Sequence, residues 1–256
     1  MTTAMDRDAI DRAAKLLDKA RRTGKRLDRL PETSRPRSAV EAYAIQLATV
    51  AEMGDSMAGW KVAASAEYGL LIGILVRSRV FEDEAAISSA ARMSMRGVEA
   101  EIAFRFDQTL PPRELTYERA DVEAAVTAFP AIEIVDSRFR DYHGTPVIDR
   151  AADFMSNGGF VVGSARDDWR SFDLAKLEAR LTIDGVEIVR RVGGHSAGDP
   201  LIPAIALANY LRTSTGAPAG MVTTTGTFTG LEFANVNSVV QATFEGFGSV
   251  TCQFEV

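Results

Sequence analysis

The stretch Val98-Glu99-Ala100-Glu101-Ile102-Ala103-Phe104 alternates with a period of two, and it decides the interpretation of the fold. Successive side chains of a β-strand point to opposite faces, so the large apolar residues share one face while Glu99 and Glu101 share the other. The alternation continues to Phe106. It predicts a strand with one face in the core and two carboxylates on the opposite face.

Further short runs typical of strands recur from Gly59 to the end of the chain, with helical patterns between only some of them. The expected strands span 60–63, 98–106, 131–135, 160–162, 179–183, 186–192, 221–228, 239–244 and 250–256, and the expected helices among them span 117–129 and 200–212. Runs of adjacent strands mixed with a few helices predict an α+β fold.

The first 58 residues have a different pattern, which is typical of helices. Apolar residues recur at helical spacing over 6–23, and a second helix is expected to start at Ser38, which has capping-box spacing to Glu41. The sequence therefore predicts an N-terminal helical segment over 1–58 and a catalytic domain over 59–256. The basic residues of the first helix and its end are expected on a solvated face: Arg21, Arg22, Lys25 and Arg26.

Composition excludes several classes of protein. The 256 residues are 46% hydrophobic, enough for a full core, and carry a net charge of −6, which argues against binding the nucleic-acid backbone. The single cysteine, Cys252, permits no internal disulfide, and neither a membrane-spanning run nor a signal-peptide pattern stands out. We expect a cytoplasmic protein.

Three glutamates form a candidate metal site. Glu99 and Glu101 place two like charges close together, which is costly unless something neutralises them, and carboxylate oxygens are the ligands that Mg²⁺ and Mn²⁺ prefer. Glu133 interrupts the otherwise apolar run 131–135 and could supply a third ligand, leaving positions for substrate and water. From spacing alone, solvated glutamates on exposed strand faces remain the alternative.

Two other motifs concern catalysis. Lys61, flanked by apolar residues, could carry a proton or anchor a carboxylate, although a solvated strand residue is the commoner case. The run 194–198 fits the G-x-S-x-G pattern of serine hydrolases, but no histidine follows Ser196 to act as its base, since His143 and His195 are the only histidines. A glycine-rich turn explains that run better.

Six segments resemble the 2-keto-4-pentenoate hydratase and 4-oxalocrotonate decarboxylase group of the fumarylacetoacetate hydrolase-like fold. They occur in the family's order and cover nearly the whole chain. The segments are Gly59-Trp60-Lys61-Val62, the strand at 98–104, 130–138, Ala152-Asp153-Phe154-Met155-Ser156-Asn157-Gly158-Gly159, Gly198-Asp199-Pro200-Leu201 and Gly246-Phe247-Gly248-Ser249-Val250.

The resemblance implies a mixed, strongly bent β-sheet or roll and a divalent-metal-dependent lyase acting on a small 2-keto acid, by hydration or decarboxylation. Glu99, Glu101 and Glu133 would hold Mg²⁺ or Mn²⁺, which would chelate the substrate's carboxylate and 2-oxo oxygen. Lys61 would assist proton transfer as the catalytic residue, and Ser156 would lie at the substrate. The stabilised enolate is common to both reactions.

The chain departs from the family pattern at Arg77, which takes the place of a family aspartate that handles water or protons. An arginine cannot act as a base, but it can bind a carboxylate in a bidentate way. Arg77 is therefore a candidate for binding a second anionic group of the substrate.

Other activities on the same scaffold remain open: a C–C hydrolase, a keto–enol tautomerase, or a catalytically idle partner subunit of a hydratase–decarboxylase complex. The expected partners are a small 2-keto acid and further copies of the chain. The resemblance also implies possible association with a related hydratase, decarboxylase or aldolase. Neither nucleic acid nor a membrane is expected as a partner.

Overall fold

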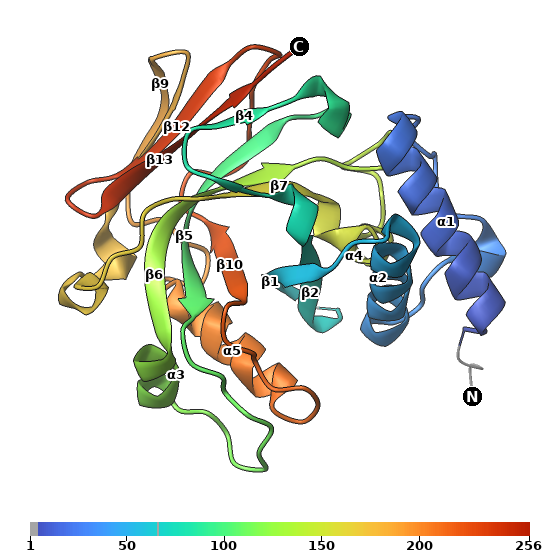
Figure 1. Cartoon of the computed structure of the whole chain (residues 1–256), viewed down its shortest axis with the longest axis horizontal. Helices are drawn as coiled ribbons and strands as arrows, with labels where there is room; N and C mark the ends of the chain where they lie inside the picture. Colours follow the sequence, from blue (N-terminus) through green and yellow to red (C-terminus); the bar gives the residue numbers. More distant parts are fainter. Residues whose placement is uncertain (1–4, 66) are drawn as a thin grey trace.

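The computed structural model describes residues 5–65 and 67–256, in which two β-sheets pack together and the N-terminal helices lie beside the larger sheet (Figure 1). The strands are β1 Met57–Ser65, β2 Gly69–Val76, β3 Val80–Glu82, β4 Ala85–Ile87, β5 Gly97–Phe106, β6 Val126–Val135, β7 Asn157–Val162, β8 Glu178–Ile183, β9 Val186–Val192, β10 Val222–Thr227, β11 Glu232–Phe233, β12 Val239–Phe244 and β13 Gly248–Phe254. The α-helices are α1 Arg7–Thr23, α2 Ala39–Met53, α3 Arg119–Ala125, α4 Val147–Ala152 and α5 Leu201–Leu211.

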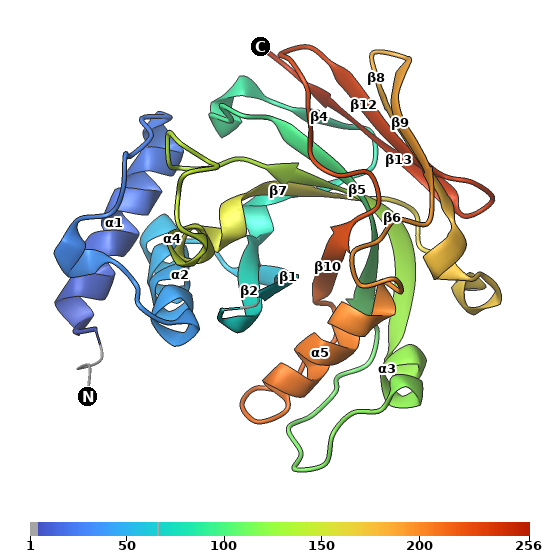
Figure 2. The ribbon, with the colours of Figure 1, turned by 180° about the vertical axis from the view of Figure 1, so that it is seen from behind.

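The larger sheet has eight strands in the order β2-β1-β10-β5-β6-β7-β3, with β11 paired to β5. It is mixed, because β1 runs parallel to β10 while β5 runs antiparallel to both β10 and β6. Figures 1 and 2 show it strongly curved, with β1 and β2 toward the N-terminal helices and β5 and β6 beside the second sheet. The predicted α+β class with a bent mixed sheet is confirmed.

The main core lies between the two sheets. The second sheet has the order β4-β13-β12-β8-β9. The apolar face of β5 predicted from the alternation is fully buried in this core, since Val98, Ile102 and Phe104 have no exposed surface. Helix α5 packs into the same cluster through Leu201, Leu207 and other residues. One face of β5 is thus fixed in the core, and the face with the glutamates must point the other way.

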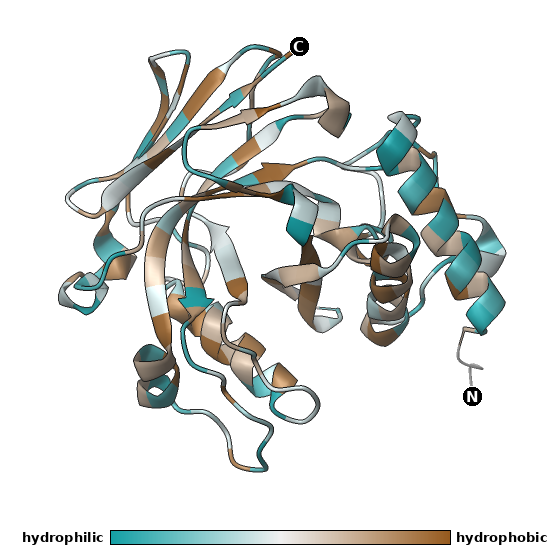
Figure 3. Ribbon diagram, in the orientation of Figure 1, coloured by the Kyte–Doolittle hydropathy of each residue, from teal (hydrophilic) through white to brown (hydrophobic). Residues whose placement is uncertain are grey.

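Helices α1 and α2 form a second, smaller core with α4 and the start of β2. Their ends follow the sequence signals: Asp6 and Ser38 are the N-caps, and Gly24 and Gly54 end the helices in the left-handed conformation. In Figure 3, α1 is largely hydrophilic in colour whereas α2 and α5 are largely hydrophobic. The boundary between 58 and 59 stays a prediction.

One predicted helix is wrong in extent, and strand β2 was missed. The expected helix over 117–129 is only α3, because the chain enters β6 at Val126 and pairs with β5 along ten consecutive positions. Strand β2 was not expected. It pairs with β1 and is buried on both faces from Leu71 to Val76, so it lacks the alternation by which half-buried strands are found.

No helix among the described residues is long and apolar enough to cross a bilayer.

Candidate active site

The three predicted glutamates come together on the face of the large sheet opposite the main core. The register pairs Glu99 of β5 directly with Glu133 of β6, and Glu101 lies two residues further along the same face. One carboxylate oxygen from each glutamate lies within 4.8 Å of the others. Glu101 and Glu133 are buried and Glu99 is half-buried, so solvated strand faces are excluded for this cluster.

Glu133 receives two hydrogen bonds on one oxygen and none on the other. Lys61 Nζ donates to Oε1 at 2.8 Å, and Asn157 Nδ2 donates to the same atom at 3.1 Å. Oε2 is buried without a partner. A buried carboxylate oxygen ordinarily has a donor or a cation beside it, so Oε2 is the free ligand atom of this side chain.

Glu101 is held by the backbone of β10. Its Oε2 accepts hydrogen bonds from the amides of Thr225 and Gly226, both at 3.1 Å. The strand bulges here, and Gly226 has a φ of +114°, which side chains of L-residues rarely adopt. The glycine therefore lets both N–H groups point at Glu101.

The electrostatics of the cluster follow from burial and like charge. Burial raises the pKa of Glu99 to about 7, Lys61 opposing the rise and Glu133 adding to it. Burial, then the charges of Glu133 and Glu99, hold the pKa of Glu101 well above its usual range. Burial alone would lower the pKa of Lys61, but the charges of the three glutamates outweigh it and raise that pKa.

These residues fit a divalent cation. They offer three hard carboxylate oxygens on one side of a common point, one of them buried and unpartnered, and they carry more negative charge than Lys61 can neutralise. Three ligands on one side leave the other coordination positions for a ligand and water.

Ser156 ends a strained turn that packs against β2. Phe154, Met155 and Ser156 all have positive φ values, of 51°, 52° and 61°. Such residues cost roughly 1–3 kcal/mol each and cluster at functional sites. Gly73, which pairs with Lys61, admits this turn, since a Cβ atom there would lie 2.6 Å from the Phe154 carbonyl oxygen. The Ser156 hydroxyl is buried without a partner.

The structure does not bring Arg77 together with the glutamates. Arg77 follows β2 directly, is exposed, and donates from Nη2 to the Met57 carbonyl at 3.3 Å. Gly73 lies opposite Lys61, so Arg77 is four residues, or roughly 13 Å, further along the strand. Contact between Arg77 and substrate stays a prediction.

Asn157 and Arg21 are the supporting residues that the sequence analysis missed. The Asn157 carbonyl accepts hydrogen bonds from Arg21 Nη2 at 3.2 Å and Arg138 Nη2 at 3.0 Å. Arg138 Nε in turn contacts Asp153 Oδ1 at 2.7 Å. The prediction that Arg21 lies on a solvated face is wrong, because it is only 6% exposed. Its helical spacing from the buried Leu17 was the available signal.

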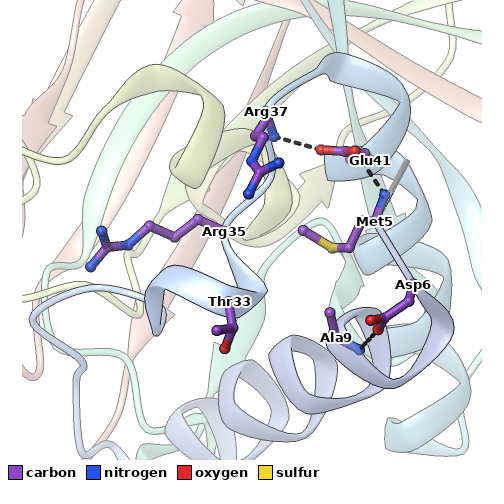
Figure 4. A pocket seen from close by; sticks show the side chains of 7 residues that line it. All are labelled: Met5, Asp6, Ala9, Thr33, Arg35, Arg37 and Glu41. Atoms are coloured by element: carbon purple, nitrogen blue, oxygen red, sulfur yellow. Dashed lines mark hydrogen bonds between the residues drawn. The ribbon is translucent and has the colours of Figure 1, made fainter. Parts of the chain in front are cut away.

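A separate hollow of about 170 Å³ lies between α1, α2 and the chain that joins them (Figure 4). Glu41 lines it and accepts hydrogen bonds from the backbone amides of Met5 and Arg37. Its lining contains none of the predicted site residues: it consists of Met5, Asp6, Ala9, Thr33, Arg35, Arg37 and Glu41.

Replacing Asn157 with leucine is expected to weaken Mn²⁺ binding, because Glu133 loses a hydrogen bond that orients its carboxylate. Removal of such supporting bonds costs roughly 10–100-fold in metal affinity. Calorimetric titration with Mn²⁺ measures the metal affinity of the variant and of the wild type. The control is Gln46→Leu, which removes another buried amide, one that binds the Ile72 and Ala151 carbonyls. If Asn157→Leu and Gln46→Leu bound Mn²⁺ with equal affinity, Asn157 would not support the metal site through Glu133.

Comparison with known proteins identifies related sequences. No family model matches the chain. The 2-keto-4-pentenoate hydratase of Paraburkholderia phymatum is 31% identical over 262 residues, covering 97% of this chain and 98% of the relative. The 2-hydroxyhexa-2,4-dienoate hydratase of Comamonas testosteroni is 34% identical over 186 residues, covering 71% of this chain and 69% of that protein.

Solved structures support the fold. The 4-oxalocrotonate decarboxylase of Pseudomonas putida G7, complexed with magnesium and adipate, has a TM-score of 0.85 at 21% identity and covers 99% of this chain and 100% of that one. The fumarylpyruvate hydrolase of Pseudomonas aeruginosa, with Mn²⁺ and pyruvate, has a TM-score of 0.56 at 12% identity, covering 77% and 88%. The predicted fumarylacetoacetate hydrolase-like fold is confirmed.

The chain belongs to the 2-keto-4-pentenoate hydratase family, since the likeness at 31% identity extends over nearly all of both sequences.

Proposed function

We propose that this protein is a divalent-metal-dependent lyase that acts on a small 2-keto acid or its 2-hydroxydienoate form. Glu99, Glu101 and Glu133 would hold Mg²⁺ or Mn²⁺, Lys61 would be the catalytic residue, and Ser156 would contact the substrate. Hydration is the first choice between the two lyase reactions, because the relatives with full-length likeness are named as hydratases.

The observation that carries this proposal is the convergence of three glutamates around a buried, unpartnered carboxylate oxygen on Glu133. A divalent cation there would act as a Lewis acid toward the carboxylate and 2-oxo oxygens of the substrate and favour enolate formation. His195 does not suit the water-activating base of a hydrolase, because it binds the Thr225 carbonyl through Nε2 at 3.0 Å and packs against Phe228.

The protein's own groups would handle protons and position the substrate. Lys61 Nζ, 2.8 Å from Glu133, lies beside the glutamate cluster and can deliver a proton to a substrate bound there. The Ser156 hydroxyl, free of any protein partner, can accept or donate a hydrogen bond to the same molecule. The strained turn fixes that hydroxyl, which reduces the entropy lost on binding.

Turnover of a panel of substrates tests the proposal. Purified protein with Mg²⁺ or Mn²⁺ is expected to hydrate 2-hydroxypenta-2,4-dienoate, seen as loss of the diene absorbance, and a chelator is expected to stop the reaction. 4-Oxalocrotonate with CO₂ detection separates a decarboxylase from a hydratase. Cleavage of an acylpyruvate into pyruvate and a carboxylic acid would instead identify a C–C hydrolase. No turnover of any substrate in the panel would favour a catalytically idle subunit.

A further inference from the structure

Thr224 lies in the middle of the large sheet, on the same face as the glutamates. Its neighbours in register are Lys61 on β1 and Ala103 on β5. Residues paired across strands point to the same face, and so do residues two apart along a strand, so Ala103 shares this face with Glu101. The side chain of Thr224 therefore lies one strand from Lys61 and one strand from the strand that carries Glu99 and Glu101.

The Thr224 hydroxyl is fully buried and has no hydrogen-bond partner among residues 5–65 and 67–256. The adjacent hydroxyls differ: Thr225 Oγ1 donates to the Ile102 carbonyl at 2.9 Å, and Thr223 Oγ1 contacts the Thr224 carbonyl at 3.4 Å. A buried polar group without a partner costs roughly 1–3 kcal/mol, which valine, of nearly the same shape, would avoid. Folding therefore does not explain a threonine at this position.

The surroundings of the hydroxyl offer it no other group of the protein. On this face Thr224 is flanked by Val222 along β10 and by Ala103 across to β5, neither of which has a polar side chain. Beyond the bulge the next residue on this face is Thr227, whose hydroxyl accepts hydrogen bonds from the amides of Thr229 and Gly230. Lys61, its other neighbour, directs its ammonium group to Glu133. A hydrogen-bond partner for Thr224 then comes from water or from a bound molecule, and a bound molecule would displace that water.

Such a molecule would also be at the glutamate cluster. The two residues after Thr224, Thr225 and Gly226, donate hydrogen bonds from their backbone N–H groups to Glu101 Oε2. Thr224 is therefore adjacent in the chain to the residues that hold a predicted metal ligand. Neighbouring strands are about 4.8 Å apart, which places Lys61, Thr224 and β5 within the length of a small keto acid. A hydroxyl can donate to a carboxylate or keto oxygen at this point.

We infer that the Thr224 hydroxyl hydrogen-bonds an oxygen of the 2-keto-carboxylate head group of the substrate, an assignment that rests on the proposed function. Thr224 is then a substrate-binding residue placed at a cost to stability. Binding removes that cost, because the substrate oxygen supplies the missing partner.

Thr224→Val tests this assignment, with Thr224→Ser and Thr223→Val as controls. Thr223 lies on the same strand but pairs with Trp60 and Phe104 on the opposite face. Three quantities are measured for each variant: the melting temperature without ligand, the Kd for Mn²⁺, and the Kd for oxalate and for pyruvate with Mn²⁺ present.

The expected result combines three changes. Thr224→Val melts at or above the temperature of the wild type, binds Mn²⁺ as tightly, and binds oxalate and pyruvate at least roughly tenfold more weakly, the size of one hydrogen bond to a charged group. Thr224→Ser keeps most of the oxalate affinity because it keeps the hydroxyl. Thr223→Val binds both ligands like the wild type.

Unchanged oxalate and pyruvate affinity in Thr224→Val would overturn the assignment, and so would equal weakening in Thr223→Val. Failure of the proposed function would give a different result. If the wild type bound Mn²⁺ and oxalate but turned over no member of the substrate panel, the proposed lyase activity would be refuted. The comparison of the Thr224 variants would still decide whether Thr224 contacts the ligand. A wild type that binds no oxalate with Mn²⁺ present would overturn both.

Discussion

Replacing Glu101 with glutamine is expected to weaken Mn²⁺ binding by more than roughly a hundredfold, because loss of a ligand should exceed the 10–100-fold effect of losing a supporting bond. Turnover should fall with it. Without metal, the variant should melt at or above the temperature of the wild type, since one of three clustered carboxylates is neutralised. A glutamine oxygen can still accept the amides of Thr225 and Gly226.

Glu178→Gln is the matched control for this variant. Glu178 is a strand glutamate outside the cluster, paired with Arg190 at 2.8 Å on the second sheet. It should bind Mn²⁺ like the wild type and gain no stability. If Glu101→Gln retained the affinity of the wild type for Mn²⁺, Glu101 would not be a metal ligand.

Replacing Lys61 with methionine is expected to reduce turnover by roughly a hundredfold or more, the usual contribution of a positioned proton carrier. Mn²⁺ binding should be unchanged or tighter, because a positive charge beside the three glutamates is removed. Metal affinity thus separates the two substitutions, because it falls in Glu101→Gln and does not fall in Lys61→Met, while activity falls in both.

The stability of Lys61→Met should depend on metal. Breaking a buried ion pair costs up to about 3–5 kcal/mol, and Lys61 is 2.8 Å from the fully buried Glu133. The metal-free variant should therefore melt well below the wild type, and Mn²⁺ should restore much of the difference. Lys176→Met, which removes an exposed lysine paired with Asp173, should change neither property. Full activity in Lys61→Met would show that the lysine is not catalytic.

Local pattern was enough to predict the strand that carries two of the glutamates. The alternation over 98–106 gives both faces of β5, since one face is apolar throughout. Glu133 could be recognised as unusual in an apolar strand. Its position opposite Glu99 could not be derived from the residues, because the register between β5 and β6 is a long-range property of the sheet.

Other parts of the site depend on tertiary contacts that leave little trace in the sequence. Arg21 resembles its solvated neighbours in composition, yet it is buried because the loop around Asn157 supplies its hydrogen-bond partner. Strand β2 is apolar without alternation and is buried although it is an edge strand of the large sheet. Thr224 becomes noticeable only when β1, β10 and β5 are aligned and its hydroxyl is left unpaired.

The most direct test of the metal site is anomalous diffraction from a crystal soaked with Mn²⁺ and oxalate. The account predicts one strong manganese peak with oxygens of Glu99, Glu101 and Glu133 about 2.1 Å away, as expected for octahedral ions of this size, and oxalate completing the coordination beside Lys61. Manganese bound elsewhere, with Lys61 still paired to Glu133 and the three carboxylates free of metal, would contradict it.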